Sequence, residues 1–224
     1  MERHHFETDL QALKNRLLNM GAMVEERVHG AIQALMERNL EAAEAIARGD
    51  GEVNALQIEI DDRCLKLLAL QQPMASDLRL ITAAMKINAD LERIGDQAVN
   101  IAENAVKVAA SPPLRPIIDL PRMAEIAEGM TRDSLDAFVR RDANLARDIL
   151  ARDDEVDQLK DQIFRVLLTH MIADPGTIER ALGLILVSRN LERIADHATN
   201  IAEDVIFMVS AQDVRHHPPA HERA

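Results

Sequence analysis

Apolar residues recur every three or four positions along most of this chain, which is the period of an α-helix with one buried face. The prolines fall between these periodic segments or at their first turns, where proline is tolerated. The pattern predicts six long helices, at about 6–38, 40–71, 73–110, 121–141, 143–171 and 175–210. In the second of these we expect a kink at Gly49-Asp50-Gly51, because glycines weaken the helical hydrogen-bond ladder.

A duplicated segment divides the chain into two related halves. The string LERIGDQAVNIAE at 91–103 returns as LERIADHATNIAE at 191–203, changed only at its fifth, seventh and ninth letters. Similarity at a fixed period is typical of repeated structural units. DGEVNAL at 50–56 likewise aligns with DDEVDQL at 153–159, and a proline follows each segment. We therefore expect an all-α protein of two tandem homologous three-helix bundles with up-down topology.

The prolines also set the expected domain boundaries. The first bundle covers 1–110, a proline-rich linker covers 111–121, and the second bundle covers 122–210. The remaining segment, 211–224, is polar and broken by prolines, so we expect a disordered tail.

The composition narrows the functional classes. Apolar residues make up 47% of the chain, yet it has four Phe and no Tyr or Trp, which suits packed helices better than sheets. The net charge of −12 argues against nucleic-acid binding and against adsorption to anionic lipid. The single cysteine, Cys64, fits a buried position in a protein of the reducing cytoplasm. With no signal peptide and no apolar run long enough to span a bilayer, we expect a cytoplasmic protein without membrane insertion.

Acidic residues recur at helical spacing on the last predicted helix of each half. At 100° per residue they lie roughly opposite the apolar face, and so they point outward. A third stripe follows an i, i+4, i+8 spacing on the helix predicted at 143–171. The three sets are Glu92, Asp96, Asn100 and Glu103; Glu192, Asp196, Asn200 and Glu203; and Asp153, Asp157 and Asp161.

Two interpretations of these stripes remain open. Like charges at i, i+4 repel one another by a few tenths of a kcal/mol, so a duplicated acidic stripe favours a bound cation. Hard cations take several oxygen ligands from more than one helix, which makes a multi-carboxylate site for Mg, Mn, Zn or Fe on each bundle one hypothesis. The other is a solvated acidic face neutralised by salt bridges, with Arg93 and Arg193 as the partners.

No catalytic motif accompanies the acidic stripes. The sequence lacks a glycine-rich phosphate loop, a G-x-S-x-G nucleophile turn, a His-Glu-x-x-His pair and a Cys-x-x-Cys pair. No nucleophile or general base is marked by its neighbours. We therefore expect a protein that is not an enzyme.

The order of the motifs resembles that of the PhoU family of phosphate-transport regulators. D-x-x-V-N at 50–54 is followed by P-x-x-x-D-L-R at 73–79, and then by two copies of LERI-x-D-x-A-x-N-IAE. The resemblance covers the whole chain except the tail. It implies a pair of three-helix bundles in a cytoplasmic homodimer, which reaches the inner face of the membrane only through protein partners.

The resemblance also implies a function. PhoU proteins are negative regulators of phosphate uptake and of the phosphate-starvation response, and they couple the phosphate ABC transporter ATPase to a sensor histidine kinase. Family members hold metal ions at Glu-x-x-x-Asp motifs, which correspond here to Glu92/Asp96 and Glu192/Asp196. A metal-buffering helical bundle without a transporter partner is the alternative function.

The first half departs from the metal-binding pattern. Asn54 and Ile58 stand where the second half has Asp157 and Asp161. Since Asn offers only a carbonyl oxygen and Ile offers no ligand, we expect the second half to bind metal more tightly.

Overall fold

The computed structural model describes residues 2–49, 51–71, 73–114 and 119–215, and within these ranges all regular structure is helical. The prediction of an all-α protein is confirmed. Part of the expected linker (115–118) and most of the expected tail (216–224) lie outside the described residues. The helices are α1 (Glu2–Glu37), α2 (Leu40–Ala47), α3 (Gly51–Gln71), α4 (Ala75–Ala109), α5 (Leu120–Arg140), α6 (Ala143–Ala173) and α7 (Ile178–Ser210), with a short 3₁₀ turn, η1 (Pro175–Thr177), before α7.

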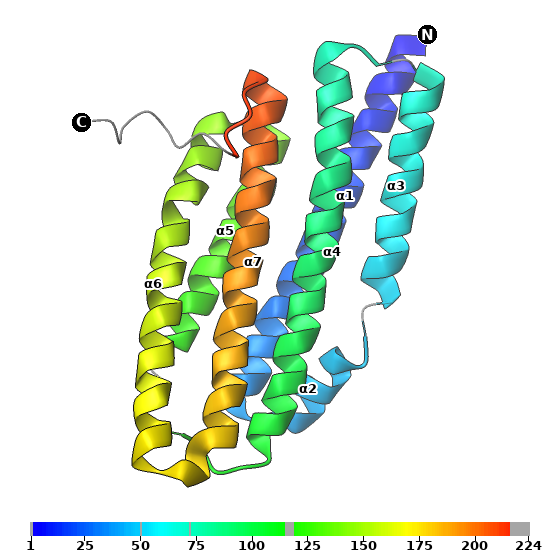
Figure 1. The fold of residues 1–224 in the computed structure, drawn as a ribbon. Coiled ribbons are helices and arrows are strands. Elements are labelled where there is room, and N and C mark those ends of the chain that lie inside the picture. Colours follow the sequence, from blue (N-terminus) through cyan, green and yellow to red (C-terminus); the bar gives the residue numbers. More distant parts are fainter. Residues whose placement is uncertain (1, 50, 72, 115–118, 216–224) are drawn as a thin grey trace, which may run out of the picture.

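The two bundles stand side by side with their last helices in the middle. Figure 1 shows α4 and α7 antiparallel at the centre, with α3 outside α4 and α6 outside α7. Behind this row lie α1 and α5, which also pack against each other. The first bundle thus consists of α1 to α4 and the second of α5 to α7. Successive long helices run in opposite directions, which is the predicted up-down topology.

The prediction of a single kinked helix at 40–71 is wrong. The chain breaks there into α2 and α3, at the glycines where the kink was expected. Gly49 has φ = 127°, a conformation that L side chains rarely adopt and that glycine enters at little cost. Asp50, the middle residue of the predicted kink, lies outside the described residues. A backbone turned this far at Gly49 cannot continue the i to i+4 hydrogen bonds, so α2 ends.

The core is aliphatic, as the composition predicts. The inward positions of α1 at Leu13, Leu17 and Val24 have no solvent exposure. Cys64 is also completely buried, and burial raises the pKa of its thiol to about 12, so it packs as a small hydrophobe. The prediction of a buried cysteine is confirmed.

Two glycines mark close helix crossings. A Cβ atom added at Gly183 of α7 would lie 2.6 Å from Cγ2 of Val108 on α4. A Cβ atom at Gly21 of α1 would overlap the side chain of Leu135 on α5. Both crossings join one bundle to the other, so the absence of these side chains sets how closely the bundles approach.

Side-chain caps begin two of the second-half elements. Asp142 accepts hydrogen bonds from the amides of Asn144 and Leu145 at the start of α6. Asp174 accepts a hydrogen bond from the Gly176 amide and caps η1. None of the described helices combines the length and the apolar character that a membrane span requires.

Candidate functional site

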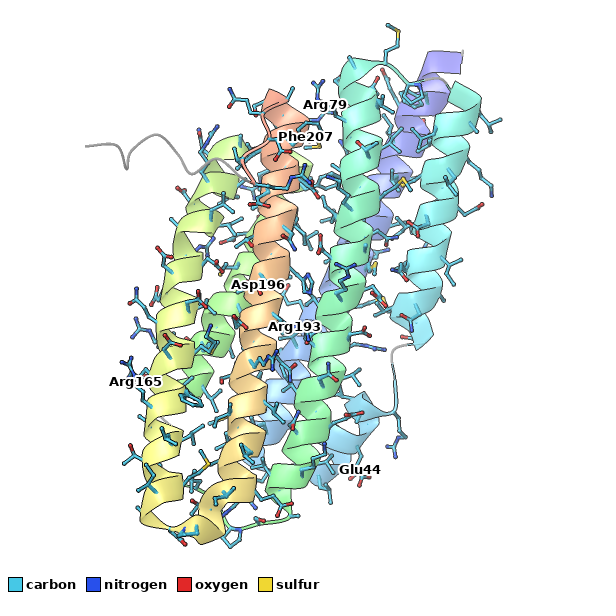
Figure 2. The ribbon with its side chains drawn as sticks, in the orientation of Figure 1. Glu44, Arg79, Arg165, Arg193, Asp196 and Phe207 are labelled. Atoms are coloured by element: carbon cyan, nitrogen blue, oxygen red, sulfur yellow. The ribbon has the colours of Figure 1, made fainter. Side chains whose placement is uncertain are left out.

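The acidic face of the second half is built from two antiparallel helices. Asp153 and Asp157 come from α6, and Glu192 and Asp196 come from α7. Asp157 and Asp196 are exposed, whereas Asp153 and Glu192 are half-buried. Figure 2 shows Asp196 about half-way along α7. We call these four residues the second acidic face.

Mutual repulsion and burial act on these carboxylates together. The pKa of Asp153 is raised to about 6, first by burial and then by the negative charges of Asp196 and Asp157. Burial also raises the pKa of Asp196, with the charge of Glu192 as the next cause. A positive charge placed on the second acidic face would therefore be stabilised.

A lysine already supplies such a charge. Nζ of Lys160 on α6 donates hydrogen bonds to Oδ1 of Asp157 at 2.9 Å and to Oε1 of Glu192 at 3.0 Å. These hydrogen bonds raise the pKa of the Lys160 ammonium group, so it stays charged. The sequence analysis considered Arg93 and Arg193 as the neutralising partners, and both of these side chains are exposed. It missed Lys160, whose i+3 spacing from Asp157 is the signal that could have found it.

Metal ligation by the predicted residues stays a prediction. Within the described part of the chain, no three His, Cys, Asp or Glu side chains converge as a metal site. The carboxylate oxygens of the second acidic face are the kind of ligand that a hard cation prefers. Two of these oxygens, however, already accept hydrogen bonds from Lys160. Asp161 is exposed on α6, and Glu203 is half-buried on α7. On α5, Asp133 is paired with Arg152 and Asp136 with Arg140.

The first half offers fewer carboxylates near its motif. Glu92 is half-buried and Asp96 is exposed on α4. Ile58 is 69% exposed on α3, where the second half has Asp161. Glu103 lines an open hollow between α2 and the end of α4, away from these two residues.

The side chain of one predicted asparagine ligand, Asn200, contacts the other bundle. Asn200 lies on α7, and its Nδ2 is 3.4 Å from Oδ1 of Asp90 on α4. The backbone carbonyl of Asn100 accepts a hydrogen bond from Nδ2 of Asn104. Asn200 therefore faces the contact between the two bundles and not the second acidic face.

Two contacts between α4 and α7, each with a buried aspartate, were not predicted from the sequence. Nδ1 of His197 lies 2.9 Å from Oδ1 of Asp90, and these residues are only 9% and 7% exposed. Nζ of Lys86 donates to Oδ1 of the buried Asp204 at 2.7 Å, which opposes the rise that burial causes in the pKa of Asp204. The repeat contained a signal for both pairs, since their members change together between the halves. At the related positions one hundred residues away, Asn190 and Gln97 stand in place of Asp90 and His197. Leu186 and Asn104 stand in place of Lys86 and Asp204.

Both halves match the same family. The PhoU domain matches the chain twice, at residues 17–105 and 120–205. This chain belongs to the PhoU family. A PhoU homologue of the phosphate-specific transport system from Aquifex aeolicus is 41% identical over 208 residues, which cover 93% of this chain and 94% of that protein. One from Pseudomonas putida is 40% identical over 220 residues, which cover 95% and 85%.

Solved PhoU structures share the fold. The crystal structure of PhoU from Pseudomonas aeruginosa aligns with a TM-score of 0.89 at 38% identity and covers 92% of this chain and all of that one. The phosphate transport system regulatory protein PhoU from Streptococcus pneumoniae aligns with a TM-score of 0.86 at 29% identity. All the predicted metal ligands lie inside the two PhoU repeats, and the first repeat contributes one acidic set whereas the second contributes two.

Proposed function

We propose that this protein is an accessory protein of a phosphate-specific transport system and takes part in its regulation. The observation that carries the proposal is that two PhoU repeats cover more than three quarters of the chain. Relatives that align over more than nine-tenths of this chain are named accessory proteins of that system. The Streptococcus pneumoniae protein of the same fold is named a regulatory protein of phosphate transport.

In this proposal the protein acts by binding and not by catalysis. It restrains phosphate uptake and the starvation response by docking on the transporter ATPase and on a sensor histidine kinase at the inner face of the membrane. The acidic residues of α4 and α7 support this mode, since a negative surface is recognised by a basic patch on a partner. Metal ions on the acidic faces, held in the second half by Asp153, Asp157, Glu192 and Asp196, would neutralise that surface.

Self-association is the second part of the proposal. Large apolar side chains are exposed in an i, i+4, i+8 series near the end of α6 and in another at the start of α7. These are Phe164, Leu168, Ile172, Ile178, Leu182 and Leu186. Large apolar side chains exposed at helical spacing are a feature of protein interfaces. We propose that it supports a homodimer.

Removal of charge from the acidic faces tests the regulatory proposal. The variant carries Glu92→Gln, Asp96→Asn, Glu192→Gln and Asp196→Asn, which keep side-chain shape nearly constant. We expect it to fold normally and to derepress phosphate-uptake genes in phosphate-replete cells. Asp148→Asn, an exposed change on α6, is the control. Normal repression together with a melting temperature far below that of the parent would show that the acidic residues are structural.

The metal-buffering alternative predicts a different pattern in cells. A regulator co-purifies with a transporter ATPase, and its deletion changes phosphate-uptake genes. A buffering protein lacks that partner, and its deletion slows growth only in excess metal. A pull-down from phosphate-replete and phosphate-starved cells, with growth measured in excess Mn²⁺, separates the two functions.

A further inference from the structure

Lys160 lies where the two helices of the second acidic face meet. Its ammonium group joins Asp157 on its own helix to Glu192 on α7, at 2.9 and 3.0 Å. The Lys160 side chain is 29% exposed and that of Glu192 is 24% exposed, so the contact is partly sheltered from solvent. A sheltered contact is screened less than an open surface pair, and it holds two long side chains in one geometry.

The repeat shows that this lysine and one of its two carboxylate partners, Asp157, are exchanged together, whereas Glu192 has a glutamate, Glu92, at the related position. The alignment of 50–56 with 153–159 places Asn54 opposite Asp157 and extends to place Gln57 opposite Lys160. The half that lacks the aspartate thus also lacks the lysine. Paired exchange of opposite charges is expected of an ion pair. It is not expected of a ligand set, because lysine has no lone pair to offer a metal when it is charged.

We infer that Lys160 is the resident cation of the second acidic face and competes with metal ions for Asp157 and Glu192. The ammonium group repels a divalent ion placed at the same oxygens, and it already uses their lone pairs. The competition rests on the metal binding in the proposed function. The number of carboxylates led us to expect tighter metal binding in the second half. The competition opposes that expectation, because the second half also contains Lys160.

The role as resident cation is tested without metal. In EDTA, we expect Lys160→Gln to lower the melting temperature by about 2–4 °C, which corresponds to about 1 kcal/mol in a domain of this size. Lys160→Arg should retain most of the stability. Lys66→Gln is the control, since Lys66 contacts Asp62 in an exposed i, i+4 pair on α3, and we expect a change below about 1 °C. Equal melting of Lys160→Gln and Lys66→Gln overturns the inference.

A calorimetric titration with Mn²⁺ tests whether Lys160 competes with the metal ion. We expect Lys160→Gln to bind the ion at least about fivefold more tightly than the parent, and its melting temperature to rise more when Mn²⁺ is added. Equal affinities would overturn the competition. If neither protein binds Mn²⁺ while Lys160→Gln is destabilised in EDTA, the metal part of the proposed function fails and Lys160 alone neutralises the face.

Discussion

At the scale of single residues, Asp153 is held where its charge is disfavoured. Its pKa in the folded protein is about 6, raised from 3.8 by burial and by Asp196. A raised pKa means that the folded state binds the proton more tightly than the unfolded state does. The carboxyl therefore favours folding at low pH, and this stabilisation is lost as the pH rises from about 4 through about 6.

Replacing the Asp153 carboxyl by an amide should therefore stabilise the protein more at neutral pH than at low pH. In metal-free buffer, we expect Asp153→Asn to raise the free energy of unfolding at about pH 7.5 by about 1 kcal/mol, a value reduced for solvent screening. The gain should shrink at about pH 4.5, because the parent carboxyl is then largely protonated. Urea unfolding at the two pH values measures it. Asp148→Asn is the control, with a change of a few tenths of a kcal/mol expected. A gain that is the same at both pH values would contradict the assignment.

At the scale of helices, a glycine at a close helix crossing should tolerate an added Cβ atom less well than a glycine elsewhere. We expect Gly183→Ala to destabilise the protein by about 1–3 kcal/mol, because the new Cβ meets the stiff side chain of Val108 at 2.6 Å. Gly129 on α5 is a matched control, since the nearest atom to an added Cβ, Nη1 of Arg152, would lie 3.8 Å away. There, alanine should stabilise the helix by up to about 1 kcal/mol. Thermal or urea unfolding gives both values.

The contact of α4 with α7 gives a prediction based on a double substitution. Asp90→Ala leaves His197 buried without its carboxylate partner, and we expect a loss of about 2–3 kcal/mol. Asp90→Asn combined with His197→Gln reproduces the types of Asn190 and Gln97 from the other half of the repeat. We expect this pair to recover most of the loss in urea unfolding. If the double variant is as unstable as Asp90→Ala, the charges themselves are required at this position.

The positions of single helices could be predicted from the sequence more closely than the contacts between helices. Apolar periodicity and prolines placed most of the helices, since both act within a few turns of chain. The division of α2 from α3 was missed because periodicity does not distinguish a weakened helix from a turn with positive φ at Gly49. The Asp90–His197 pair was missed for another reason. It depends on which helices are neighbours, and the pattern of a single helix does not contain that.

At the scale of the whole molecule, the exposed apolar residues give a prediction about assembly. We expect the protein to sediment as a dimer at micromolar concentration, and Leu182→Glu to shift it to monomer by placing a charge in the apolar surface. Leu70→Glu is the control, since Leu70 is 76% exposed on the other bundle. Sedimentation velocity over a range of concentrations measures both. Equal dissociation in the two variants, or none, would show that the dimer forms elsewhere or not at all.

The central packing of α4 against α7 has a consequence for how the two halves diverge. In a dimer of identical subunits, a substitution in a twofold contact appears at both symmetry-related places, so a charge can never change on one side alone. Joining the halves in one chain removes that restriction. Asp90 and His197 are charged or titratable where Asn190 and Gln97 are neutral, although all four are buried at related positions. Covalent duplication thus allows one interface to hold an acid–imidazole pair at one place and two neutral amide residues at the related place.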